Sequence, residues 1–160
     1  MASIFRSVQQ PVQHEVPLQN LGPLCELDTT GTERMDLIIT YSCLPPTLAD
    51  VTVAHPSPSH LPMSSASQMY TPLYFAKKAE AQKYSRYLAT ARAMNHLFHP
   101  YALETFGSCG PMLDNTLKAL ADRFRNMTTL VSNSEVSEKP QLVRFWRVKI
   151  SQLCKEKIQS

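Results

Sequence analysis

Two aspartates lie in the most apolar part of the sequence, where burial is expected. Asp36 belongs to the run RMDLIITY (34–41), and Asp50 belongs to the run LADVTVAH (48–55). Two carboxylates that meet in a poorly hydrated place repel each other unless a proton or a cation lies between them. Mg²⁺ binds carboxylate oxygens, keeps several waters and bridges to phosphate. Paired acids of this kind are therefore typical of phosphodiester hydrolysis.

Both runs are rich in β-branched residues, which predicts two buried strands joined by a hairpin-like return. Side chains alternate along a strand, so Asp36 shares a face with Ile38, and Asp50 shares a face with Thr52. If the strands pair, both carboxylates can converge on one point. The competing interpretation is structural: one acid caps a turn or pairs with Arg34.

The elements that must position these acids follow from the rest of the pattern. After the two strands the sequence predicts a Pro/Ser-rich loop (56–72), a helix (73–97), a third strand (97–107) and two further helices (112–127 and 140–158). This order indicates an α/β fold with a mixed central sheet of three to five strands flanked by helices. The stretch 12–19 is a short strand or helix.

Composition narrows the classes of protein that need to be considered. At 160 residues the chain has the size of a single domain, expected over 13–158, with a flexible N-terminal segment at 1–12. The four cysteines form no CxxC pair, which argues against a zinc site or a disulfide framework. No apolar run of membrane-spanning length and no signal peptide is visible, so we expect an intracellular protein without a membrane partner.

The charge is distributed unevenly along the chain. Residues 1–70 carry a net charge of −4, and residues 71–160 carry +7. An acidic N-terminal half that holds metal ions and a basic C-terminal half would suit a polyanionic partner. The same charge distribution also arises in proteins with helix-rich C-terminal halves that have no binding role.

Several segments together resemble a known family. RMDLIIT, LADVTVAHP, AKKAEAQKYSRYL and FHPYALETFG occur in the order found in the PD-(D/E)XK nuclease domain that follows the reverse transcriptase of some non-LTR retroelements. The pair His14–Glu15 and the closing LVRFWRVKISQLC are similar to the flanking parts of that domain. The resemblance extends from Gln13 to Cys154.

The resemblance implies a restriction-endonuclease-like fold and metal-dependent DNA cleavage, with Mg²⁺ or Mn²⁺ as cofactor. It implies that Asp36 and Asp50 are the acids of the two motif strands and that Glu15 is a further metal ligand. The motif lysine is expected two residues beyond Asp50, where this chain has Thr52. A hydroxyl cannot supply the positive charge that stabilises the phosphorane-like transition state. Lys83, on the following helix, is the candidate to replace it.

Each assignment has a structural competitor. Lys83 can be a solvated helix lysine, since its surroundings are rich in charge, and Gln82 is a weaker candidate beside it. Glu104 is either a further ligand or a solvated strand-end acid. None of the five histidines is interpreted as a ligand or base. A basic face near the C-terminus either binds phosphate or keeps the protein soluble; it contains Arg144, Arg147 and Lys149.

The preferred hypothesis is a retroelement-related, metal-dependent DNA endonuclease domain, intracellular and nuclear, fused to or associated with a reverse transcriptase. The second is a catalytically inactive descendant of the same fold that binds nucleic acid or a protein partner, which Thr52 favours. The third is a small protein-interaction domain in which the loop 56–72 binds a partner and the aspartates are structural.

Overall fold

The computed structural model describes residues 1–7, 9–21, 34–42, 44–55, 73–105, 107–131 and 139–159. The predicted loop 56–72 lies outside these residues. The elements are α1 (Ala2–Ser7), β1 (Val12–Pro17), the 3-10 turn η1 (Leu18–Leu21), β2 (Arg34–Tyr41), β3 (Leu44–Ala54), α2 (Tyr74–Ala93), β4 (Leu97–Glu104), α3 (Pro111–Val131) and α4 (Lys139–Gln159).

The four strands form one open mixed sheet in the order β1-β2-β3-β4. The β1–β2 and β2–β3 pairs are antiparallel, whereas β3 and β4 are parallel and are joined by the crossover helix α2. The predicted α/β class, with a mixed sheet of three to five strands flanked by helices, is therefore confirmed.

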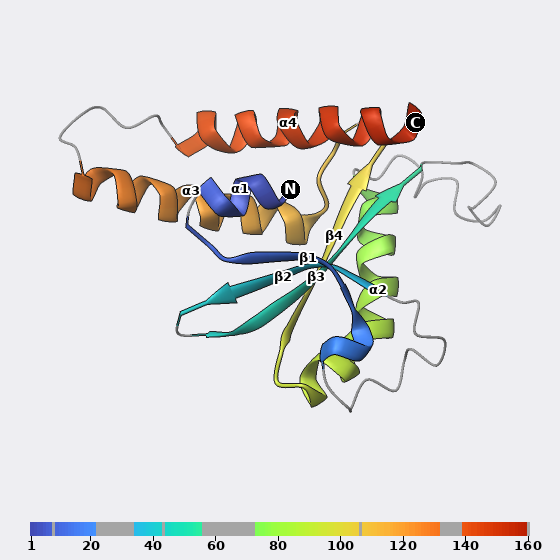
Figure 1. Ribbon diagram of the computed structural model, residues 1–160. Coiled ribbons are helices and arrows are strands. Elements are labelled where there is room, and N and C mark those ends of the chain that lie inside the picture. Colours follow the sequence, from blue (N-terminus) through green and yellow to red (C-terminus); the bar gives the residue numbers. More distant parts are fainter. Residues whose placement is uncertain are drawn as a thin grey trace.

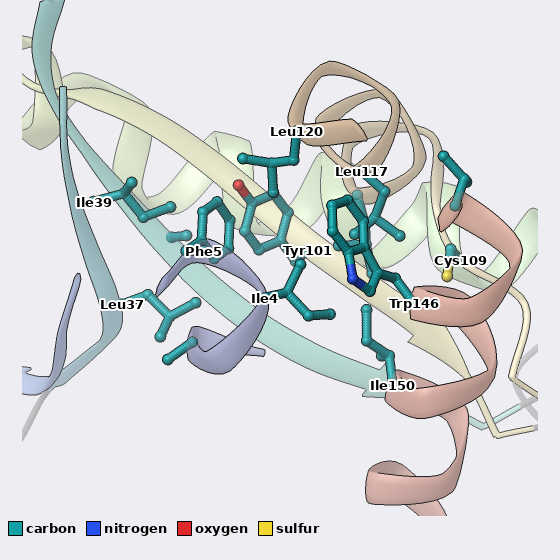
Figure 2. Packing of buried hydrophobic residues seen from close by; sticks show 14 of the residues in the cluster. Ile4, Phe5, Leu37, Ile39, Tyr101, Cys109, Leu117, Leu120, Trp146 and Ile150 are labelled. Atoms are coloured by element: carbon teal, nitrogen blue, oxygen red, sulfur yellow. The ribbon is translucent and has the colours of Figure 1, made fainter. Parts of the chain in front are cut away.

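Helices cover both faces of the sheet, with α2 on one face and α1, α3 and α4 on the other (Figure 1). The α3–α4 face holds the larger apolar cluster, in which Phe5 stacks with Tyr101 at 6.4 Å between ring centroids (Figure 2). Phe124 meets Trp146 edge-on beside this cluster. Burial of one such large side chain contributes about 1.5–3 kcal/mol. Trp146 is thus a core residue, as the spacing of apolar residues in α4 predicts.

The α2 face holds a second, smaller cluster. Its buried members are Leu18, Met35, Ile38, Leu48, Tyr87, Ala91 and Phe98. Ile38 and Leu48 are direct partners across the β2–β3 ladder, and Tyr87 of α2 packs on Phe98 of β4 at 5.5 Å between ring centroids. This cluster fixes α2 over the central strands, which sets where its polar side chains can reach.

The N-terminal segment differs from the expectation of a flexible stretch at 1–12. It forms α1, and Ala2, Ile4 and Phe5 are buried against the sheet. The physical reason is that Ile4 and Phe5 bury enough apolar surface to offset the entropy of ordering six residues. The sequence offered only one short apolar pair there, without a second helical turn to reveal the period.

Two glutamates join α2 to the neighbouring elements. Buried Glu80 of α2 accepts a hydrogen bond from the backbone N–H of Met112 (3.1 Å to Oε1) at the start of α3, and backbone N–H groups of Ala102 and Leu113 also bond to it. Burial raises the pKa of Glu80, although these hydrogen bonds oppose the shift. At the C-terminal end of β4, Glu104 accepts a hydrogen bond from the backbone N–H of Ala76 (3.3 Å) in the first turn of α2. Glu104 therefore caps a helix and is not a solvated strand-end acid.

Replacing Glu80 by alanine should destabilise the protein by about 1–3 kcal/mol, because buried backbone N–H groups at the start of α3 would lose their acceptor. Chemical denaturation measured by circular dichroism tests this. Gln82→Ala, an exposed position on the same helix, is the matched control and should stay within about 0.5 kcal/mol of wild type. Equal free energies of unfolding for the two variants would show that Glu80 does not stabilise this junction.

Candidate functional site

The strand register brings the two aspartates into one row. Leu37 pairs with Ala49 and Ile38 with Leu48, so one further step places Asp36 opposite Asp50. Ile38 and Leu48 both point into the α2-facing cluster. Asp50, two residues beyond Leu48, lies on that same face and contacts α2. Met35 and Leu37 pack into opposite clusters, so alternation is interrupted at Asp36, whose position follows instead from its contact with β3.

Asp36 reaches across to β3 with its side chain. Its Oδ2 lies 2.6 Å from the backbone nitrogen of Val51, the residue that follows Asp50. A carboxylate here accepts the bond that a backbone carbonyl would accept in a continuous ladder, and the charge makes this bond short and strong. The Asp36 carboxylate is therefore held against the peptide that joins Asp50 to Val51.

Asp50 is bound by two side chains at one oxygen. Lys83 Nζ lies 2.8 Å and Thr52 Oγ1 lies 3.2 Å from Asp50 Oδ2. The Asp50 side chain is 10% exposed and that of Lys83 is 30% exposed. Within the part of the chain that the structure describes, no hydrogen bond reaches Oδ1.

Lys83 comes from the sheet-facing side of α2. Glu80, Lys83 and Tyr87 recur at three and four residues along the helix, and Glu80 and Tyr87 are buried. The ammonium group also lies 5.6 Å from the centre of the Tyr87 ring, a cation–π distance. The structure thus places a lysine charge at Asp50 where Thr52 has none. Gln82, the weaker candidate, is exposed.

Glu15 lies in the same row but on the edge strand. Its neighbours His14 and Val16 pair with Leu37 and Met35, which places Glu15 across from Asp36. Its side chain is exposed and its backbone has a φ of 47°, in the left-handed region that costs a non-glycine residue of the order of 1 kcal/mol or more. Among the described residues no group of three or more His, Cys, Asp or Glu side chains could hold a metal ion. Glu15 is therefore not gathered with Asp36 and Asp50 into a three-ligand site.

Asp36 and Asp50 remain as possible carboxylate ligands, too few to enclose an ion within the protein. Mg²⁺ is commonly held by one or two carboxylates together with waters and substrate phosphate. Asp36, Asp50 and Lys83 sum to one negative charge at neutral pH, which still attracts a cation.

The basic residues of α4 lie elsewhere. Arg144, Arg147 and Lys149 are exposed on a helix that packs over α3, on the face of the sheet opposite α2 (Figure 1). Arg147 is paired with Asp114 of α3. The structure therefore does not bring these three residues to the aspartates, and a nucleic acid that touched both would have to pass around an edge of the sheet.

Sequence reasoning missed the part that Glu80 plays in positioning the site. The spacing of Glu80, Lys83 and Tyr87 on one helical face was available as a sign, but a glutamate within AKKAEAQKYSRY has the pattern of a solvated charge. Only the tertiary structure, which places the start of α3 against that face, shows that Glu80 anchors the helix that carries Lys83.

Comparison with protein-family models, with curated proteins and with solved structures gave no match. Among the described residues, no helix combines the length and the apolar character needed to cross a membrane.

Proposed function

We propose that this chain is a metal-dependent endonuclease domain of the PD-(D/E)XK type that hydrolyses phosphodiester bonds in DNA. The observation that carries the proposal is the contact of Lys83 Nζ with Asp50 Oδ2, beside an Asp36 carboxylate held at the next peptide. Two acids and one lysine, from β2, β3 and α2, thus lie close together at the two central strands of the sheet. This is the set of charges that the nuclease chemistry requires, although the lysine comes from a helix.

Asp36 and Asp50 would hold the ion, which when bound lowers the pKa of a water and neutralises charge on the scissile phosphate. The ammonium group of Lys83 would donate hydrogen bonds to the phosphate oxygens as negative charge develops on them. For this the ammonium group has to be shared between Asp50 and the substrate, and its long flexible side chain permits that movement. The hydroxyl of Thr52 keeps Asp50 oriented.

The test is cleavage of supercoiled plasmid by the purified protein with Mg²⁺, with Mn²⁺ or with EDTA. We expect nicked product with either metal ion and none with EDTA, because the hydrolytic water is activated only when the carboxylates hold a cation. Binding of the metal ion depends on the negative charge of the two acids, so Asp36→Ala should abolish nicking. The circular dichroism spectrum of this variant should remain that of a folded protein. Cleavage that persists unchanged in EDTA would contradict the proposal.

A second function is favoured by a separate observation. Asp50 already has an ion-pair partner in Lys83, and Thr52 stands at the motif lysine position. Both features would suit an inactive nuclease fold kept for nucleic-acid binding or assembly. Salt-sensitive DNA binding without any metal-dependent nicking would select this second function.

The relation to a retroelement, the association with a reverse transcriptase and the nuclear location stay predictions based on the resemblance alone. The third hypothesis, a protein-interaction domain, rests on the loop 56–72, which lies outside the described residues.

A further inference from the structure

A pocket of about 500 Å³ lies beside the edge of the sheet at β4, away from the aspartates. Three helices and the segment that follows β4 contribute to its wall, and its lining residues include Lys77, Ser108, Asp114, Asn115 and Arg147. Lys77 belongs to α2 and Arg147 to α4, so the pocket joins the two helical layers that otherwise lie on opposite faces of the sheet (Figure 1).

The charges in this pocket favour an anion. Asp114 contributes a negative charge, but Lys118 Nζ lies 2.8 Å from its Oδ2 and Arg147 is paired with its Oδ1. Although burial alone would raise it, these two cations hold the pKa of Asp114 below its usual value. The charged residues that line the pocket, Lys77, Asp114 and Arg147, sum to one positive charge, and Lys118, which lies outside the lining, adds a second beside Asp114. The acid therefore orients Arg147 without cancelling the field of the pocket.

The donors suit phosphate oxygens. The guanidinium of Arg147 is fixed by Asp114, which uses part of its donor set and leaves the rest of the fork for a second oxyanion. Lys77 is exposed and has no acidic partner among the described residues. Ser108 and Asn115 add a hydroxyl and an amide, which are common neutral donors to phosphate.

We propose that this pocket is a phosphate-binding subsite for the nucleic-acid backbone, with Lys77 and Arg147 as its cationic donors. The choice of DNA as the ligand rests on the proposed function, and the subsite would define the path of the DNA backbone over the protein. Lys77 and Lys83 are six residues apart, about 9 Å along the axis of α2. One strand of a duplex advances about 3.4 Å per nucleotide, so the subsite would hold a phosphate about three nucleotides from the scissile bond.

Through this subsite, one basic residue of α4, Arg147, would contact the DNA backbone. A backbone that leaves Lys83 along α2 passes Lys77 and then reaches Arg147 around the edge at β4. Arg144 and Lys149 are not among the residues that line the pocket, so the proposal separates Arg147 from its two basic neighbours.

Binding of a fluorescent DNA duplex in EDTA tests the subsite without cleavage. Lys77→Ala should weaken binding about 5–10-fold near 0.1 M salt and lower the slope of log K against log salt concentration by about 1, the effect of losing one phosphate contact. The matched control is Lys78→Ala, which removes the same charge from the next position of the same helix, outside the pocket. It should change affinity less than 2-fold. Equal effects of the two variants, or no binding by the wild type, would overturn the subsite.

A second experiment distinguishes whether the pocket binds free phosphate or the phosphates of a polynucleotide. Titration of ¹⁵N-labelled protein with inorganic phosphate should shift the amides of Ser108 and Asn115 only weakly, whereas the duplex should shift them at micromolar concentration and Lys77→Ala should suppress the shift. Saturation by inorganic phosphate with no competition from the duplex would mean that the pocket takes a small anion and would overturn the proposed path. A Lys77-specific loss in a protein that never nicks plasmid would support the subsite while contradicting the nuclease proposal.

Discussion

Replacing Asp50 by asparagine is expected to lower the rate of metal-dependent plasmid nicking by at least about 100-fold, because a neutral amide cannot hold the divalent ion that stabilises transition-state charge. Asparagine keeps the size of the side chain and can still accept a hydrogen bond from Thr52. The loss should therefore reflect the missing charge and not a change in packing. The measurement is the initial rate of nicking at saturating Mg²⁺.

The variant also removes the partner of Lys83, whose side chain is 30% exposed. A partly exposed lysine can turn toward water, so we expect a loss of about 1 kcal/mol at most in the free energy of unfolding. Rates should be compared well below the unfolding transition of both proteins.

The matched control for Asp50→Asn is Asp122→Asn. Asp122 is an aspartate of α3 that lies outside the row of acids and is not among the residues that line the pocket at Arg147. This control should nick plasmid at a rate within a few-fold of wild type. Similar losses in both variants would indicate a general effect on folding, and full activity of Asp50→Asn would remove this residue from the site.

Replacing Lys83 by methionine should lower the nicking rate about 100-fold, the usual effect of losing one donor to a developing oxyanion. The same change should leave metal affinity equal or higher, because the ammonium group no longer competes for Asp50. Rate and metal affinity should therefore move in different directions. Nicking rates and Mn²⁺ binding by isothermal titration calorimetry measure the two effects separately.

Two outcomes would contradict this role for Lys83. A structural ion pair would leave the nicking rate of Lys83→Met close to wild type. If Lys83 instead helped to organise the metal site, metal affinity would fall together with the rate. Lys83→Arg keeps the charge but changes the geometry of the donors, so it should recover part of the activity lost in Lys83→Met.

The strands that carry the acids could be predicted because their signals are local. Dense β-branched runs identify β2 and β3, and the observed register then places Asp36 opposite Asp50. The lysine could be named only as a candidate, since its reach depends on the packing of Tyr87 against Phe98, which fixes how α2 lies over the sheet.

Other features depended on tertiary structure that no local pattern reveals. The burial of Glu80 requires the start of α3 to approach α2, and the separation of Arg147 from Asp50 follows from which helices cover which face of the sheet (Figure 1). A charged residue within a charge-rich helix gives the same sequence pattern whether it is exposed to solvent or buried against the start of another helix. The sequence therefore predicts the acids of the site better than it predicts the cations around them.

The left-handed backbone at Glu15 has a consequence for the outer edge of the sheet. Among the strands that the structure describes, β1 is the first in the sheet order, and no described strand pairs with its outer side. An unpaired edge is a template on which another chain can add a strand. The turn of the chain at Glu15 interrupts the regular row of donors and acceptors, and Pro17 contributes no N–H at the end of the strand. The β1 edge is thus poorly shaped for intermolecular β-pairing, a feature that disfavours aggregation through this edge.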